Sequence, residues 1–318
     1  MRVLVTGAQG CIGAWVVKTL VERGVDVLAF DLETDPVRLN LIAPPQLVRK
    51  VQMESGAIED RARVKALVRE GEITHIVHLA AVLLPYCQVN PVEGAMVNVI
   101  GTLNVFEAAR DAGRPVRVAY ASSAAVWGPE AEYGGKTLTE DDPVRPVTHY
   151  GVFKQANEQC ARVFYSVNGI SSIGLRPWAA YGVGRDRGLT ADPTLAMKAV
   201  ALGERFNIRV SGYMDMQYVE DVADSFVGCL FSPLEGAHVF NLVGDVVEMR
   251  ELVDTLDRLR PGAAQLITIN GPQVPVAFRM DGSQLHAKVP GLKRTPLAEG
   301  IEKTLRIFEQ LRERTDSQ

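Results

Sequence analysis

Strand-like and helix-like segments alternate along the first half of the chain, and this alternation constrains the fold more than any other feature. Residues 2–7, RVLVTG, form an apolar run with β-branched side chains, which is typical of a strand buried on both faces. Residues 12–24 follow with apolar side chains at helical spacing and end at Gly24, a typical helix-terminating glycine. Repeated along the chain, this order predicts a parallel sheet with helices on both faces.

The alternation continues through the first half of the chain and weakens after about Ile173. We expect further strands at 25–31, 74–81 and 116–123, and helices at 59–71, 92–113 and 150–167. Residues 176–193 are rich in Gly, Pro and Arg and predict a loop. A late apolar run at 238–244 predicts a strand that returns to the sheet, and surface helices are expected at 252–262 and 297–314.

The composition excludes several classes of protein. With 318 residues, 47% of them hydrophobic and 23% charged, the chain has the material for one large globular domain or two closely joined ones. A net charge of −4 gives no indication of a nucleic-acid partner. No apolar stretch is long enough to cross a bilayer, and the first residues lead directly into a strand, so we expect no membrane segment and no signal peptide.

The cysteines and histidines show no metal-binding pattern. The four cysteines are widely spaced, at Cys11, Cys87, Cys160 and Cys229. Their small number is typical of reduced, buried thiols, so we expect a cytoplasmic protein without a metal. His75 and His78 have no metal partners in the sequence around them and are expected to pack or to cap.

The first strand leads into a glycine-rich loop, TGAQGCIG, in which Gly7, Gly10 and Gly13 are spaced three apart. Glycine lets a phosphate approach the backbone, and the helix that follows offers free N–H groups to an anion. The spacing is GxxGxxG rather than GxGxxG, and alone it could be a simple tight connection. Asp31, which ends the second strand, is placed to hold a ribose diol or to act only as a turn residue. Together they predict a dinucleotide site that favours NAD over NADP, because Asp31 would repel a 2′-phosphate.

A second informative pair is Tyr150 and Lys154, which stand four residues apart and so share one face of a helix. The apolar residues between Phe153 and Val167 form a stripe on a different face. Tyrosine has an unperturbed pKa of about 10, too high for a general base at neutral pH. A nearby ammonium and the positive nicotinamide of NAD⁺ would favour the phenolate, which makes Tyr150 a candidate acid–base group.

Several further motifs occur in a consistent order. They are TGAQGCIG (6–13), Asp31, HLAA (78–81), NVIGTLNVFEAAR (98–110), YASSAAVWG (120–128), YGVFK (150–154), GLRPWAAYGVGR (174–185) and YVEDVA (218–223). Together they resemble the extended short-chain dehydrogenase/reductase family, in its NAD-dependent epimerase/dehydratase group, over most of the chain. The resemblance implies an α/β fold with a Rossmann-type doubly wound parallel sheet, a smaller C-terminal substrate-binding domain, and a homodimer. We expect the NAD-binding domain at 1–174, with 219–244 returning to it, and the substrate-binding domain at 175–218 and 245–318.

The resemblance also implies roles for single residues. Ser123 matches the serine that holds the substrate oxygen, Tyr150 matches the acid–base residue, and Lys154 matches the residue that binds the nicotinamide ribose and lowers the pKa of the tyrosine. The implied NAD-binding residues are Gly7, Gly10, Cys11, Ile12, Gly13, Asp31, Ile58, Leu79, Ala80, Ala81, Asn98, Tyr150 and Lys154. The substrate is expected against Leu83, Ser123, Trp178 and Arg185. The family's usual Asp before Ile58 is Ala57 here, so the adenine contact departs from the pattern.

This constellation predicts an oxidoreductase or epimerase. Tyr150 takes a hydroxyl proton while a hydride passes from the carbinol carbon to NAD⁺, and Ser123 orients the oxygen. Release of the ketone gives a dehydrogenase and re-reduction on its opposite face gives an epimerase, and the sequence leaves both open. A dehydratase is disfavoured, because Ala124 and Ala125 stand where such enzymes carry an acidic pair. A non-catalytic, dinucleotide-binding regulatory protein on the same fold is the alternative of another class.

Two positions bear on the substrate. Family members that act on nucleotide sugars hold the diphosphate and nucleoside with an Asn and an Arg, whose places are taken here by Ala179 and Met214. Loss of two charge-assisted hydrogen bonds, each worth about 1.5–3 kcal/mol, would weaken binding by roughly a hundredfold or more. We therefore expect a free sugar, sugar acid or similar small polyol, with any carboxylate or phosphate met by Arg185 or Arg187. A nucleotide-sugar epimerase is the alternative.

Overall fold

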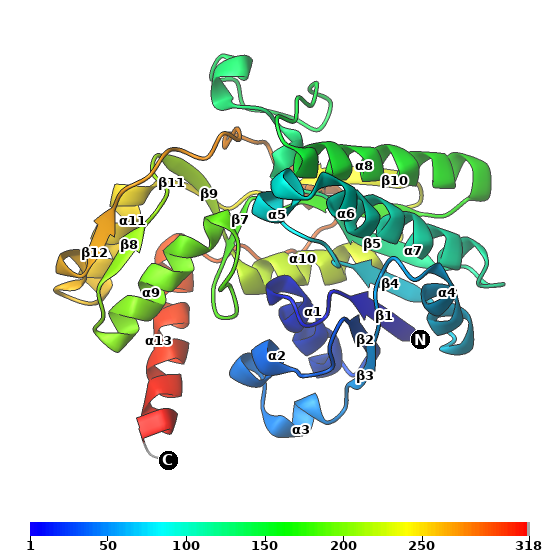
Figure 1. The fold of residues 1–318 in the computed structure, drawn as a ribbon, viewed down its shortest axis with the longest axis horizontal. Coiled ribbons are helices and arrows are strands. Elements are labelled where there is room, and N and C mark those ends of the chain that lie inside the picture. Colours follow the sequence, from blue (N-terminus) through cyan, green and yellow to red (C-terminus); the bar gives the residue numbers. More distant parts are fainter. Residues whose placement is uncertain (317–318) are drawn as a thin grey trace.

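The computed structural model describes residues 1–316, and it confirms the predicted parallel sheet with helices on both faces (Figure 1). The strands of this sheet are β1 (Arg2–Thr6), β2 (Asp26–Asp31), β3 (Gln52–Ser55), β4 (His75–His78), β5 (Arg117–Ala121), β6 (Ser172–Arg176) and β10 (Ala237–Asn241). Their order is β10-β6-β5-β4-β1-β2-β3, and all neighbours pair in parallel. The late strand β10 therefore returns to the sheet beside β6, as its apolar run predicted.

Each face of the sheet has its own apolar core, because alternate side chains of a strand point to opposite faces. Val3 and Val5 of β1 belong to one core, whereas Leu4 belongs to the other. On the first face α1 (Cys11–Glu22) packs against α10 (Val219–Phe231), and on the second α4 (Arg61–Glu70) packs against α7 (Gly101–Arg110) (Figure 1). Helix α8 (His149–Asn168) lies beside α7. Burial on both faces explains why β1 reads as an apolar run.

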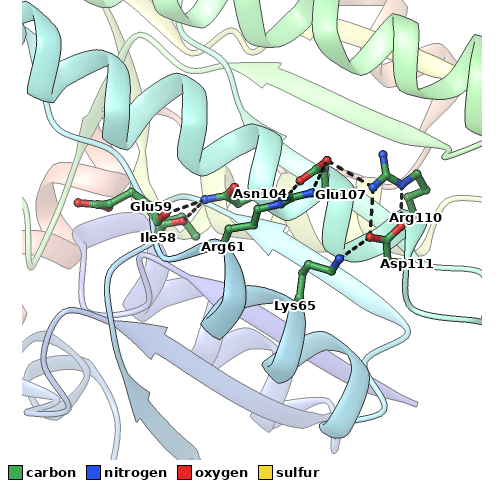
Figure 2. Close-up of polar contacts among 8 residues, drawn as sticks. All are labelled: Ile58, Glu59, Arg61, Lys65, Asn104, Glu107, Arg110 and Asp111. Carbon is green, nitrogen blue, oxygen red and sulfur yellow. Dashed lines mark hydrogen bonds and ion pairs between the residues drawn. The ribbon is translucent and has the colours of Figure 1, made fainter.

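Polar side chains join α4 to α7 across the second face (Figure 2). Arg61 pairs with Glu107 at 2.6 Å and Lys65 pairs with Asp111 at 2.7 Å, and because all four side chains are partly exposed to solvent these ion pairs add little stability. The Asn104 amide is different, because it is buried and donates to the Ile58 carbonyl at 3.0 Å and to the Glu59 carbonyl at 3.1 Å. Asn104 thus fixes the segment that the sequence places beside the adenine.

The helix expected at 92–113 is interrupted. It consists of α6 (Pro91–Ala95), a π-helical turn at Met96–Ile100, and α7. The wider turn contains Asn98, and such turns are frequent at functional sites. The short helices that the sequence did not predict include α2 (Val37–Ile42), α3 (Pro45–Val48) and α5 (Leu84–Val89).

Shorter elements form the other end of the molecule (Figure 1). One small sheet has the order β11-β9-β7 and another pairs β12 with β8. Their strands are β7 (Ala179–Tyr181), β8 (Phe206–Ile208), β9 (Tyr213–Tyr218), β11 (Asp245–Glu248) and β12 (Ile267–Ile269), and the helices are α9 (Asp192–Leu202), α11 (Met249–Leu259), α12 (Ser283–Lys288) and α13 (Leu297–Asp316). Short 3-10 turns lie at Ala124–Val126, Glu130–Tyr133, Leu189–Ala191 and Ala263–Gln265.

Two expectations for this end need correction. The segment 176–193 is not all loop, because it contains β7 and the start of α9. Helix α11 begins earlier than expected, since Glu248 and Glu251 form a reciprocal capping box at its start. The division into an NAD-binding domain at 1–174, with 219–244, and a substrate-binding domain stays a prediction.

Candidate active site

The three glycines predicted to bind phosphate lie where β1 turns into α1. Gly7 has a φ of +69°, and a Cβ on it would lie 2.6 Å from the nitrogen of Ala80, which follows β4. A Cβ on Gly13 would lie 2.1 Å from the Gly7 oxygen. The turn therefore has no room for side chains at either position. Gly10 caps α1 without a side-chain hydrogen bond, so the first N–H groups of the helix are available to an anion.

Asp31 ends β2 beside this turn. Its Oδ2 accepts a hydrogen bond from the Gln9 nitrogen at 2.8 Å, and its Oδ1 accepts one from the Leu32 nitrogen at 2.7 Å. The carboxylate is half-buried and has lone pairs left for a ribose diol. A turn closed to side chains, a helix N-terminus and an adjacent carboxylate together fit a dinucleotide.

The other predicted cofactor residues gather at the same edge of the sheet. Leu79, Ala80 and Ala81 follow β4 and are partly exposed, with the first two against Gly7. Ile58 is buried against α7, where Gly101 makes room for it: a Cβ on Gly101 would lie 2.7 Å from the Ile58 Cγ2.

His78 belongs to a buried chain of hydrogen bonds. Thr102 Oγ1 donates to the Asn98 carbonyl at 2.7 Å, so it accepts from His78 Nε2 at 3.0 Å. His78 Nδ1 is then the acceptor of the 2.7 Å hydrogen bond from the Thr6 hydroxyl. Burial lowers the pKa of His78 to about 3, so the ring stays neutral. The chain ties the end of β1 to the helical segment that carries Asn98, which agrees with a packing role for His78.

Asn98 holds the loop that leads to the substrate side. Its amide donates to the Val82 carbonyl at 3.1 Å and to the Gly94 carbonyl at 3.0 Å. The backbone carbonyl of Asn98 accepts from the side-chain amide of Asn157 in α8 at 2.9 Å. Asn98 thus joins the π turn, the loop after β4 and α8, and supports the site through its neighbours.

Ser123, Tyr150 and Lys154 come together where β5 ends and α8 begins. Ser123 caps the 3-10 turn 124–126, with Oγ accepting from the Ala125 nitrogen at 3.1 Å. A Cβ on Gly151 would lie 2.1 Å from the Ala125 oxygen, so the glycine after Tyr150 allows α8 to touch this turn. Lys154 is buried and donates to the Ala121 carbonyl at 2.8 Å. The sequence shows a glycine directly after Tyr150, but only the structure shows that this glycine is needed for α8 to contact the 124–126 turn.

Burial dominates the acid–base properties of the pair. The surroundings raise the pKa of Tyr150 to about 12, although a hydrogen bond with Ser123 and the charge of Arg185 act to lower it. Burial also lowers the pKa of Lys154 to about 8. The Lys154 Nζ lies 5.5 Å from the centre of the Tyr150 ring. The protein's own residues thus keep the Tyr150 hydroxyl protonated near neutrality, and the positive charge of a bound nicotinamide would favour the phenolate.

The predicted substrate residues Leu83, Ser123, Trp178 and Arg185 all line one cleft with Tyr150. This cleft has an empty volume of about 560 Å³. The other lining residues are Leu84, Pro85, Ala124, Ala125, Pro177, Gly188, Leu189, Thr190, Val274 and Val276. Val274 and Val276 were not predicted from the sequence, because the loop that carries them has neither a motif nor a periodic pattern.

Arg185 is the one charged residue among those lining this cleft. Its Nη2 donates to the Thr190 hydroxyl at 2.8 Å. Its Nε is buried and has no hydrogen-bond partner within residues 1–316. Arg187 is exposed and is not among the lining residues, so of the two candidate arginines only Arg185 faces the cleft.

Three further observations concern metals, thiols and membranes. Within the described residues, no three His, Cys, Asp or Glu side chains are grouped to hold a metal ion. The four cysteines are free thiols. Among residues 1–316, we find no helix with the length and apolar character needed to span a bilayer.

Comparisons with known proteins show which family this chain resembles over most of its length. A family model described as the NAD dependent epimerase/dehydratase family matches residues 3–242. UDP-glucuronate 4-epimerase 3 of Arabidopsis thaliana is 30% identical over 281 residues, which cover 81% of this chain and 64% of the plant protein. The UDP-glucose 4-epimerase of Mycolicibacterium smegmatis is 29% identical over 314 residues, which cover 97% of this chain and 98% of that protein.

A solved structure shows the same architecture. The crystal structure of the Thermus thermophilus UDP-glucose 4-epimerase in complex with NAD matches with a TM-score of 0.82 and 28% identity, and the match covers 97% of this chain and 99% of that one. The chain therefore spans just under two thirds of the plant relative and nearly all of the two bacterial ones.

The position of Asp31 generates a test of cofactor choice. We expect the wild type to bind NAD more tightly than NADP. Asp31→Ala should reduce the ratio of the two affinities by about tenfold or more, because a hydrogen bond to a charged group is worth about 1.5–3 kcal/mol. Glu33→Ala is the matched control, since it removes the same charge from an exposed position in the loop that follows. Fluorescence titration of both cofactors into the three proteins measures this. A wild-type preference for NADP would refute the role of Asp31.

Proposed function

We propose that this chain, which belongs to the NAD dependent epimerase/dehydratase family, oxidises a secondary alcohol of a carbohydrate through Ser123, Tyr150 and Lys154. It is an NAD-dependent epimerase or dehydrogenase of the extended short-chain dehydrogenase/reductase type. The observation that carries the residue roles is that Ser123 and Tyr150 line the same cleft, beside Lys154, which is anchored to the Ala121 carbonyl.

The chemistry divides between the cofactor and these side chains. The Gly7–Gly13 turn and Asp31 would hold NAD, which when bound would supply the acceptor for the hydride of the carbinol carbon. Tyr150, as a phenolate, accepts the proton of the same carbinol, and Ser123 donates a hydrogen bond to its oxygen. Lys154 is held by the Ala121 carbonyl and keeps a positive charge near the phenolate. Tyr150 returns the proton when the ketone is reduced again.

Epimerisation is the net reaction with the stronger support. The relatives described above are named as 4-epimerases. An epimerase must retain the ketone and present its opposite face to the same hydride. The walls of the cleft include the apolar side chains of Leu83, Trp178 and Val276, against which a sugar ring can turn without breaking many hydrogen bonds.

A nucleotide sugar is the first candidate substrate, in place of the free sugar that the sequence favoured. Its support is the named activity of the relatives, which are UDP-glucuronate and UDP-glucose epimerases. Arg185 adds a preference within this class. Arg185 is half-buried, its Nε is buried without a partner among residues 1–316, and such an N–H group is stabilised by an anionic acceptor. We therefore propose a sugar that carries a carboxylate, as glucuronate does.

A free sugar acid is the second candidate, supported by Ala179 and Met214. Both residues are fully buried, at 1% and 0% exposure. Neither side chain can donate a hydrogen bond to a diphosphate. A substrate without a nucleotide would not need these contacts, and its carboxylate would still be met by Arg185.

Titration calorimetry with the NAD-loaded protein separates the two candidates. The panel is UDP-glucuronate, UDP-glucose, glucuronate and glucose. We expect UDP-glucuronate to bind with an affinity at least about tenfold higher than that of UDP-glucose, and glucuronate likewise relative to glucose. The reason is that a charge-assisted hydrogen bond is worth about 1.5–3 kcal/mol. Arg185→Gln should remove this preference, and Arg187→Gln should keep it, since Arg187 is exposed outside the cleft lining.

The panel has three informative outcomes. Saturable binding of the UDP sugars but not of the free sugars supports a nucleotide-sugar epimerase. Binding of free glucuronate as tight as that of UDP-glucuronate supports the second candidate. Equal affinity for acids and neutral sugars in the wild type contradicts the role of Arg185.

Removing the Tyr150 hydroxyl tests the chemical step. Tyr150→Phe should lower turnover by about a hundredfold to ten-thousandfold, which is the usual contribution of an acid–base group, and should leave NAD affinity nearly unchanged. Tyr213→Phe is the matched control, because Tyr213 is an exposed tyrosine of β9. Both turnover of the substrate that binds in the calorimetry panel and affinity for NAD are measured for each protein. A Tyr150→Phe variant as active as the wild type would show that Tyr150 is not the acid–base group.

The homodimer implied by the family resemblance is also a proposal. Large apolar side chains are exposed along 86–100 and 147–167, on neighbouring segments of α5 to α8. They are Tyr86, Val89, Val92, Met96, Ile100, Val147, Val152, Val163, Tyr165 and Val167. A second copy of the chain would bury these residues in a self-complementary interface of paired helices.

Light scattering tests this assembly. We expect a dimer at micromolar concentration, and a shift to monomer for Val163→Arg, because an unpaired charge in an apolar interface is costly. Val246→Arg is the control, since Val246 is similarly exposed on β11, away from these helices. A wild-type monomer would count against the proposal.

A further inference from the structure

Arg38 of α2 joins two segments that lie far apart in the sequence. Its Nη1 donates to the Gln9 carbonyl at 2.7 Å. Its Nε donates to the Gly184 carbonyl at 3.0 Å, and its Nη2 reaches both carboxylate oxygens of Asp186, at 2.7 and 3.0 Å. A single guanidinium thus bridges the turn after β1 to the loop after β7.

One side of this bridge belongs to the cofactor site. Gln9 lies within the glycine turn, and its nitrogen donates to Asp31 Oδ2 at 2.8 Å. Asp31 is the residue that we assign to the ribose of NAD. A ligand that binds to Asp31 or to the glycine turn therefore restrains Gln9, whose carbonyl accepts the hydrogen bond from Arg38.

The other side of the bridge belongs to the substrate cleft. Gly184 and Asp186 are the neighbours of Arg185 in the chain, and Arg185 lines the cleft. Arg38 therefore holds the backbone on one side of Arg185 and a side chain on the other. The placement of the Arg185 guanidinium depends on where this loop is held.

The loop needs such a restraint. Gly182, Gly184 and Gly188 have φ values of +131°, +94° and +96°, and glycine backbones lose much conformational freedom when they are fixed. The Trp15 indole nitrogen supplies one restraint, since it donates to the Val183 carbonyl at 2.9 Å. Arg38 supplies a further restraint, and this one also reaches the carbonyl of Gln9 in the cofactor turn.

The geometry requires an arginine. An exposed ion pair alone contributes little, and Asp186 is exposed. The planar guanidinium, however, directs separate N–H groups at two carbonyls and a carboxylate at once, which the single ammonium of a lysine cannot do. The three contacts are coupled because they share one rigid group.

We propose that Arg38 is a positioning residue that transmits NAD binding at the glycine turn to the loop that carries Arg185. This inference rests on the proposed NAD and substrate sites. When NAD fixes the turn, Arg38 is fixed through Gln9 and in turn restrains Gly184 and Asp186, so that Arg185 is held for an anionic substrate. Coupling through such a contiguous network is measured as the response of one site to a ligand bound at the other.

Hydrogen–deuterium exchange of the full chain, with and without NAD, measures this coupling without a substrate. In the wild type, NAD should slow amide exchange both at 7–13 and at 183–190. The exchange rate at 183–190 should fall by about fivefold or more, which corresponds to the weakest couplings commonly found between two sites. In Arg38→Met, NAD should still slow exchange at 7–13 but should no longer do so at 183–190. Arg49→Met, an exposed arginine at the end of α3, is the control and should behave as the wild type.

Asp186→Asn provides a second variant that perturbs only the exposed end of the bridge and should reduce the NAD effect at 183–190. Protection at 7–13 with no response at 183–190 in the wild type would overturn this inference alone. So would an Arg38→Met or Asp186→Asn protein whose 183–190 segment responds to NAD as fully as the wild type. Absence of NAD protection at 7–13 in the wild type would overturn the proposed function and this inference with it.

Discussion

The close packing of the glycine turn against the end of β4 is the constraint on which the rest of the structure depends. The Gly7 backbone meets that of Leu79 and Ala80 at a distance that excludes a Cβ, and Gly13 lies equally close to Gly7. Because the strands are parallel, their carboxyl ends meet at one edge. The tight turn brings α1, Asp31 and the segments after β4 and β5 to that edge, where a dinucleotide and an alcohol can meet.

Buried polar groups then fix the reacting side chains. The chain from Thr6 through His78 and Thr102 to Asn98 connects the end of β1 to the π turn, and Asn157 continues it to α8. Each of these residues makes at least one hydrogen bond, while the side-chain oxygens of Asn98 and Asn157 are buried without a hydrogen-bond partner within residues 1–316, so the main effect of the network is to fix geometry. Helix α8 is therefore held in the register that brings Tyr150 to Ser123.

The sequence predicted the elements with strong patterns and missed those without them. The buried strand β1 and the Tyr150–Lys154 spacing reflect local periodicity, which is visible in one dimension. The edge strand β3 reads QMES and is half exposed, so it has no apolar run. Val274 and Val276 reach the cleft only through tertiary packing. From Ala179 and Met214 the sequence predicts a free sugar, whereas the names of the relatives support the nucleotide sugar proposed above. Two missing contacts do not reveal which other residues bind the substrate.

Following the hydrogen on the reacting carbon tests the central claim most directly. In the proposed mechanism, that hydrogen leaves and returns as a hydride that never exchanges with water, and Tyr150 handles only the hydroxyl proton. When the enzyme epimerises its substrate in D₂O, nuclear magnetic resonance should show no deuterium at the inverted carbon of the product. Deuterium from the solvent at that carbon would mean that the carbon loses its hydrogen as a proton. This result would contradict an NAD-dependent oxidation of the substrate in which Tyr150 accepts only the hydroxyl proton.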